Sequence, residues 1–148
     1  EILRVIIAGG RDFDDYDLLK KECIKIFKQL KSEGYNTNRN NLEIISGEAK
    51  GADTLGKRFG IMFKLDVVSF PAKWDDLDVE KCKIRYNKYG NPYNVLAGHN
   101  RNEEMAKYAS EDEELGVLLA FWDGKSTGTK NMIELAKKYG LRVFVVNY

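Results

Sequence analysis

The chain has 148 residues, of which 43% are hydrophobic and 32% are charged, and its formal net charge is +1. This balance predicts one globular domain over residues 1–148 and excludes a disordered tail or a membrane-spanning segment. Because basic and acidic residues nearly cancel, any phosphate recognition must be local. The two cysteines, Cys23 and Cys82, and the single histidine, His99, form no metal-ligand pattern, so we expect no metal site.

The N-terminal run Ile2–Ala8 is rich in Val and Ile and is interrupted only by Arg4. It is typical of a strand that is buried on both faces, and it is too short and too quickly followed by glycine to be a signal peptide. We therefore expect a cytoplasmic protein.

Strand-like and helix-like segments alternate along the rest of the chain. Apolar residues recur at helical spacing in several segments and form short β-rich runs between them. The predicted elements are a helix over Tyr16–Lys31, a strand over Leu42–Ile45, a helix with Leu55, Phe59, Met62 and Phe63 on its apolar face, a strand over Asp66–Phe70, a helix over Gly98–Ala109, a strand over Leu115–Trp122, a helix over Gly128–Tyr139 and a strand over Leu141–Val146.

Residues 71–97 are the least regular part of the sequence. A loop of this length within a compact domain usually contains a short helix or belongs to a functional site. The alternation elsewhere predicts an α/β fold, a Rossmann-like three-layer α/β/α sandwich with a mostly parallel sheet of about five strands. Ligands of such sheets bind at the carboxyl ends of the strands, where the strand order reverses.

Three junctions between a strand and a helix are rich in glycine, hydroxyl and amide groups: GGRDF at 9–13, SGEAKGAD at 46–53 and DGKSTGT at 123–129. Glycine lets the backbone approach a ligand closely, and the N-terminus of the following helix offers unpaired N–H groups to an anion. None of the three matches the dinucleotide or Walker A fingerprint. A single loop of this kind is equally well explained as a tight turn, but three at one sheet edge favour a phosphate site.

Individual side chains within these motifs have alternative roles. Asp53 could cap the helix that begins beside it, which is the simpler interpretation, or bind a ribose hydroxyl. Arg11 could contact phosphate or form a surface ion pair. Arg101 could face the pocket, whereas Met105 is better explained as core packing and His99 as a surface or cap residue.

The motifs GGRDF, SGEAKGAD, AGHNRNEEM and AFWDGKSTGT together resemble the YspA/YpsA-related branch of the SLOG superfamily, in order and over nearly the whole chain. The resemblance implies a Rossmann-like fold that senses or processes nucleotides and nucleotide-derived ligands, frequently in phage or mobile-element settings. It also implies relatives among the LOG-type phosphoribohydrolases and the DNA-processing protein that binds single strands, and it implies a homodimer.

The phosphoribohydrolase pattern pairs an Arg in R-K-x-x-M with a Glu in G-G-x-G-T-x-x-E. The first maps onto Arg101, with Asn102 in place of the Lys, and in the second Met132 stands where the catalytic Glu is expected. Loss of that carboxylate removes the acid/base partner for glycosidic cleavage. Glu134 lies two residues later, which on a helix turns its side chain by about 200°.

We therefore expect a binding or sensing protein for a nucleotide or an ADP-ribose-like ligand, with no established cofactor. The expected ligand-binding residues are Gly9, Gly10, Arg11, Ser46, Gly47, Gly51, Ala52, Asp53, Arg101, Asn102, Asp123, Gly124, Ser126, Gly128 and Thr129.

Two alternatives remain open. The first is a hydrolase of nucleotides or of their N-glycosidic bonds, with Arg101 and Asp53 as candidate catalytic residues and Asp123 or Glu48 as other substitutes for the missing Glu. The second is a single-stranded DNA-binding protein that uses the basic and aromatic segment 81–93. A solvated helix face explains that segment more simply, so a nucleic-acid partner is not favoured.

Overall fold

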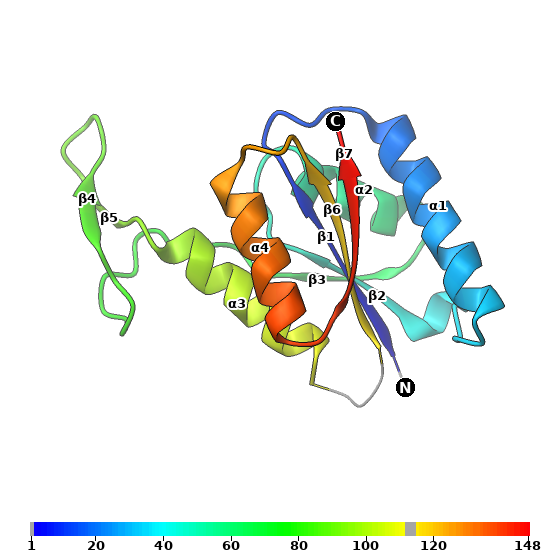
Figure 1. Cartoon of the computed structure of the whole chain (residues 1–148). Helices are drawn as coiled ribbons and strands as arrows, with labels where there is room; N and C mark the ends of the chain where they lie inside the picture. Colours follow the sequence, from blue (N-terminus) through cyan, green and yellow to red (C-terminus); the bar gives the residue numbers. More distant parts are fainter. Residues whose placement is uncertain (1, 112–114) are drawn as a thin grey trace.

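The computed structural model describes residues 2–111 and 115–148 and places the elements as Figure 1 shows. The strands are β1 (Leu3–Gly9), β2 (Leu42–Ser46), β3 (Asp66–Ser69), β4 (Ile84–Tyr86), β5 (Pro92–Asn94), β6 (Gly116–Trp122) and β7 (Arg142–Asn147). The helices are α1 (Tyr16–Ser32), α2 (Ala52–Met62), α3 (Ala97–Ala109) and α4 (Thr127–Lys138), with a short 3₁₀ turn at Arg39–Asn41.

Five of these strands form one parallel sheet in the order β3-β2-β1-β6-β7. The chain fills one half of the sheet with β1, β2 and β3 and then returns to place β6 on the other side of β1, with Val5 opposite Val117. The strand order therefore reverses between β1 and β6, which is where parallel α/β sheets bind ligands. This arrangement confirms the predicted Rossmann-like α/β fold.

Alternate side chains of the central strands enter two separate layers of the core. In β1, Val5 and Ile7 pack against α1 and α2, while Ile6 and Ala8 pack against α3 and α4. Figure 1 shows the two helix pairs on opposite faces of the sheet. Because strand side chains alternate between faces, the continuous apolar run in β1 reflects burial on both sides.

The end of α2 differs from the sequence prediction. Phe59 is buried, but Met62 is 63% exposed and Phe63 is 39% exposed, so these two do not continue the buried face. The buried face of α2 ends one turn earlier, at Phe59 and Gly60. There the helix backbone packs closely against Val67 and Ile44 of the sheet.

The segment between β3 and α3 contains no helix; instead it carries an antiparallel hairpin of β4 and β5 that projects away from the sheet (Figure 1). We call residues 74–95 the arm. Two asparagines shape it: Asn87 accepts hydrogen bonds from the amides of Tyr89 and Asn91 at the tip, and buried Asn94 bonds to backbone groups at the base. Side chain–backbone bonds, not apolar packing, thus define this segment.

Candidate functional site

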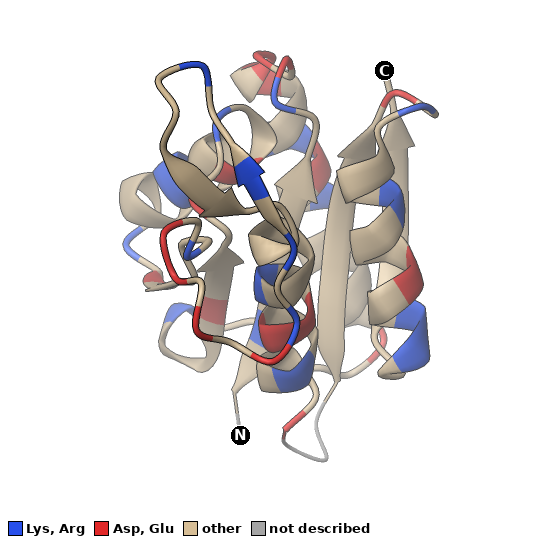
Figure 2. Ribbon diagram, turned by 90° about the vertical axis from the view of Figure 1, so that its left-hand side faces the viewer, with Lys and Arg blue, Asp and Glu red and all other residues tan. Residues whose placement is uncertain are grey.

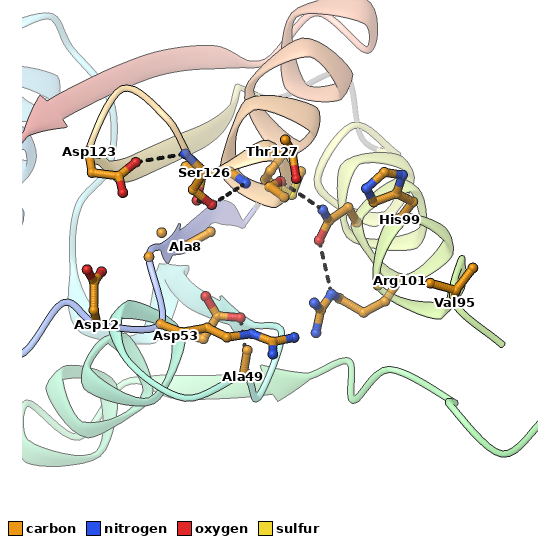
Figure 3. A pocket seen from close by; sticks show the side chains of 18 of the residues that line it. Ala8, Asp12, Ala49, Asp53, Val95, His99, Arg101, Asp123, Ser126 and Thr127 are labelled. Atoms are coloured by element: carbon orange, nitrogen blue, oxygen red, sulfur yellow. Dashed lines mark hydrogen bonds between the residues drawn. The ribbon is translucent and has the colours of Figure 1, made fainter. Parts of the chain in front are cut away.

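A cleft of about 480 Å³ opens at the carboxyl edge of the sheet, beside the point where the strand order reverses. Its walls come from the turn after β1, the loop before α2, the first turn of α3 and the loop and first turn of α4. Figure 3 shows Asp53 and Arg101 on one side of this cleft and Ser126 and Thr127 on another. The three glycine-containing junctions therefore meet at one place.

The structure divides the predicted site residues into two groups. Ten of them line the cleft: Gly9, Gly10, Arg11, Asp53, Arg101, Asn102, Asp123, Ser126, Gly128 and Thr129. The others, Ser46, Gly47, Gly51, Ala52 and Gly124, are outside the lining. Four of these lie behind its wall, where they shape the loops that carry the first group.

The turn after β1 packs directly on the start of α2. The amide of Ala52 donates to the carbonyl of Gly10 at 3.1 Å, and the amide of Gly10 donates to that of Phe121 at 3.1 Å. Gly51 has a φ of 89°, and a Cβ atom there would lie 2.3 Å from the Gly10 oxygen. Glycine at position 51 is thus required both by conformation and by close approach.

Asp53 and Arg101 come together around Gly47. A Cβ atom on Gly47 would lie 2.6 Å from Oδ2 of Asp53 and 2.8 Å from Nη1 of Arg101, so only glycine leaves room for both side chains. Arg101 also donates to the carbonyl oxygen of Gly47. The loop before α2 therefore brings a carboxylate and a guanidinium, 48 positions apart in sequence, to the same wall of the cleft.

The simpler interpretation of the sequence makes Asp53 a cap of α2, but in the structure Asp53 does not cap this helix. Gly51 occupies the N-cap position without a side-chain bond, and Asp53 instead accepts a hydrogen bond from the amide of Ala49 at 3.3 Å, in the preceding loop. Burial raises the pKa of Asp53 to about 6, although the nearby charge of Arg101 and backbone amides oppose the shift. Burial likewise lowers the pKa of the Arg101 guanidinium.

Asn102 orients Arg101 and ties α3 to α4. Its Oδ1 accepts from Nε of Arg101 at 3.0 Å, while its Nδ2 donates to Oδ1 of Asn131 at 3.0 Å and approaches the Gly128 carbonyl at 3.4 Å. Both ends of this buried amide are therefore satisfied, which fixes which end faces the guanidinium. The role of Asn102 in this geometry is to position a neighbour.

The loop before α4 is preorganised by its own side chains. Oδ1 of Asp123 accepts from the amides of Lys125 and Ser126, each at 2.8 Å, which lowers the pKa of the Asp123 carboxyl. Ser126 caps the helix and accepts from the amide of Thr129. The amides of Thr127 and Gly128 in the first turn have no hydrogen-bond partner among the described residues. They border the cleft, where the positive end of the α4 dipole lies.

Arg11 is exposed at the mouth of the cleft. Within the described part of the chain it forms no ion pair, so the surface ion pair considered from the sequence is absent there. Its charge nevertheless acts on both Asp53 and Arg101. The cleft thus combines two guanidinium groups with three carboxyl groups, those of Asp12, Asp53 and Asp123, of which only Asp53 is buried.

Met132, which the sequence pattern aligns with the catalytic Glu expected of a phosphoribohydrolase, lies in the cleft wall, and its side chain is 1% exposed. Glu134 is exposed and is not among the lining residues, in agreement with the turn of about 200° that separates the two positions. Glu48 is also outside the lining, where Lys57 and Ser69 hydrogen-bond its carboxylate and lower its pKa.

Several lining residues were not predicted from the sequence. They are Ala8, Asp12, Ala49, Trp74, Val95, Gly98, His99, Thr127 and Met132. Trp74 and Val95 come from the two ends of the arm, and the ring of Trp74 lies within van der Waals reach of a Cβ atom built on Gly98. An aromatic and aliphatic wall thus faces the polar loops. Of the nine residues, only Trp74 gave a sequence signal for a binding site, because tryptophan is a residue type that binds flat rings.

A membrane-spanning helix and a metal centre are both absent from the residues that the structure describes. None of the helices is long and apolar enough to span a membrane. No group of three or more His, Cys, Asp and Glu side chains is arranged to hold a metal ion in residues 2–111 and 115–148.

Comparison with known proteins yields a family and a structural neighbour. The structure is similar to that of DNA processing protein A (DprA) from Streptococcus pneumoniae, with a TM-score of 0.64 and 19% sequence identity. The match covers 99% of this chain and 51% of the other, so the chain spans about half the length of that protein, and the likeness concerns the fold. No curated protein matches the sequence significantly. The family model YAcAr, described as the YspA, cpYpsA-related SLOG family, matches residues 3–76, and the chain therefore belongs to this family.

Proposed function

We propose that the chain binds a nucleotide or a nucleotide-derived ligand, such as ADP-ribose, through its phosphate groups in the cleft at the switch point of the sheet. The observation that carries the proposal is the convergence of two arginines with a helix N-terminus whose first amides have no hydrogen-bond partner among the described residues. Arg11 and Arg101 supply positive charge, and the unpaired amides of Thr127 and Gly128 supply donors aimed at an anion. Helix N-termini and guanidinium groups are both strong phosphate ligands.

The rest of the cleft suits the remainder of a nucleotide. Trp74 and Val95 offer an apolar wall on which a base can stack, and Asp53 offers a carboxyl to a ribose hydroxyl. The volume of about 480 Å³ is in the range of ordinary small-ligand sites. The family assignment supports a nucleotide-related role in general terms.

Isothermal titration calorimetry with AMP, NAD and ADP-ribose tests the proposal. Gly128→Val is the most informative variant, because no atom lies within 4 Å of a Cβ built at that position, so the added side chain occupies the cleft without disturbing the fold. We expect it to weaken binding by about tenfold or more. Glu134→Ala, on the exposed face of the same helix, is the matched control and should bind as wild type.

If none of these ligands binds, or if Gly128→Val binds as tightly as wild type, the proposal is wrong. Gly47→Val gives a second measurement: its side chain would collide with Asp53 and Arg101, and it should abolish binding together with the local geometry.

A second candidate function is hydrolysis of a nucleotide, and one observation favours it. Asp53 has a pKa of about 6 and lies beside Arg101 in a cleft, and perturbed carboxyls in such positions are frequent acid/base groups. Release of free base from AMP, lost in Asp53→Asn even at AMP concentrations that saturate the variant, would establish this function. Binding without any product release would exclude it for that substrate.

A further inference from the structure

The arm has an exposed apolar surface that the cleft does not explain. Most residues between 71 and 95 are exposed; the exceptions are Ala72, Leu77, Cys82, Tyr93 and Asn94. Half of the large apolar side chains that are exposed in the described chain lie here: Trp74, Val79, Ile84, Tyr86, Tyr89 and Val95. Of these six, Trp74 and Val95 also line the cleft, and the other four do not. Tyr86 and Tyr89 are 69% and 75% exposed. A cluster of this kind on a projecting element is typical of a protein–protein contact.

The charges on the arm fall into two adjoining blocks of opposite sign. The acidic block is Asp75, Asp76, Asp78 and Glu80, and the basic block is Lys81, Lys83, Arg85 and Lys88. Figure 2 shows the acidic positions on the loop that leads to the hairpin and the basic positions on the last part of that loop and on the hairpin. Among the described residues, no ion pair joins the two blocks; Lys81 pairs with Glu103, outside the arm.

We propose that the arm mediates association with a second copy of this chain, in which the basic block of each copy contacts the acidic block of the other. A two-fold axis brings each surface element against its counterpart, so a patch with separate positive and negative halves is complementary to itself. The exposed tyrosines and Ile84 lie between and beside the charges and would form the apolar centre of the contact.

The construction of the arm agrees with this role. Asn94, 1% exposed, accepts from the amides of Lys83 and Leu96 and donates to the carbonyl of Lys81, and Asn87 bonds two amides at the tip. These bonds shape the hairpin before any partner arrives, which reduces the entropy lost on association. The arm also has about the number of residues that one side of a standard interface contains.

The same surface fits a single-stranded nucleic acid less well. Aromatic and basic side chains suit such a ligand, but the acidic block adjoins them and would repel a phosphate backbone. Association through the arm does not depend on nucleotide binding in the cleft. Trp74 and Val95 nevertheless belong to both surfaces, so a second copy would border the mouth of the cleft.

Charge reversal with sedimentation equilibrium as the readout tests the proposal. One variant carries Lys83→Glu and Arg85→Glu, and another carries Asp75→Lys and Asp78→Lys; all four side chains are exposed and none forms an ion pair with a described residue. We expect wild type at about 100 µM to have twice the monomer mass and each variant to be monomeric. An equimolar mixture of the two variants should regain the dimer mass, because each restores the complement of the other.

A third variant with Lys21→Glu and Lys137→Glu changes as much charge on α1 and α4 and should remain dimeric. Tyr86→Asp should be monomeric because it places a charge in the apolar centre, and circular dichroism checks that every variant is folded. A monomeric wild type, a dimer that both reversals leave intact, or a monomer that binds labelled oligothymidylate through the arm would each overturn the proposal.

Discussion

The sheet with its four helices and the arm are ordered by different forces. In β1 and β6 nearly every side chain is buried, and the two apolar layers leave little room for change. In β4 and β5 only Asn94 is buried, and side chain–backbone hydrogen bonds replace apolar packing. Substitutions in the sheet should therefore change global stability, whereas substitutions in the arm should act locally or on association.

The largest effect is expected in the central sheet. Leu119 of β6 is 1% exposed and lies between Ile7 and Phe144 of the neighbouring strands. Leu119→Ala should lower the free energy of unfolding by about 3 kcal/mol, because it removes buried methyl groups and leaves a cavity. Urea denaturation measures this change, and a loss below about 1 kcal/mol would contradict the packing described.

Asp53 should give the sheet edge a pH-dependent stability. Its pKa is about 6 in the folded chain against 3.8 for an ordinary Asp, so folding favours the neutral form. The stabilisation is complete below about pH 4 and is lost as the pH rises through 6, a change of up to roughly 3 kcal/mol. Asp53→Asn should remove this component, so wild type loses stability relative to the variant between pH 4 and 7.

Asp14→Asn, at an exposed position outside both the cleft and the arm, is the matched control for that measurement and should follow wild type across the same range. Parallel stability profiles for wild type and Asp53→Asn would show that the pKa of Asp53 is the same in the folded and unfolded chains, so that burial does not raise it.

The sequence predicted the sheet and its cleft better than it predicted the arm. Val and Ile runs identified β1 and β6, and glycine-rich junctions located much of the cleft, because burial and close backbone approach leave composition signals. The hairpin was missed, since its strands have only three residues each and are mostly exposed, so they show no apolar alternation. Asn94 gave no signal either, because an asparagine that bonds backbone groups looks like any loop residue.

Within the cleft, sequence reasoning placed Asp53 at a helix start but assigned it to capping. The position of Gly47, which leaves space for both Asp53 and Arg101, depends on a contact between distant segments that no local pattern encodes. Trp74 was missed for the same reason, because it joins the cleft only through the path of the arm.

A smaller and local effect is expected at the base of the arm. Asn94→Ala leaves the amides of Lys83 and Leu96 without their acceptor, a local cost of about 1–2 kcal/mol. Hydrogen exchange at these two amides should accelerate, while the exchange of β1 and β6 amides should change little. Equal acceleration throughout the sheet would show that the arm and the sheet unfold as one unit.

The smallest effect is expected at the tip of the arm. Tyr89 is 75% exposed, and Tyr89→Ala should change the free energy of unfolding by less than about 0.5 kcal/mol at low protein concentration, where the chain is monomeric. Thermal denaturation monitored by circular dichroism measures it. A change as large as that of Leu119→Ala would mean that the tip packs on the sheet.

We expect an anion to bind at the N-terminus of α4 between the glycine-containing loops, and amide chemical shifts are the sharpest test of this binding site. Titration of ¹⁵N-labelled chain with ADP-ribose should perturb the Thr127 and Gly128 amides first and most strongly, because these donors have no partner in the described chain. Saturable shifts confined to the arm, or no shift at these two amides, would show that the anion does not bind at the N-terminus of α4.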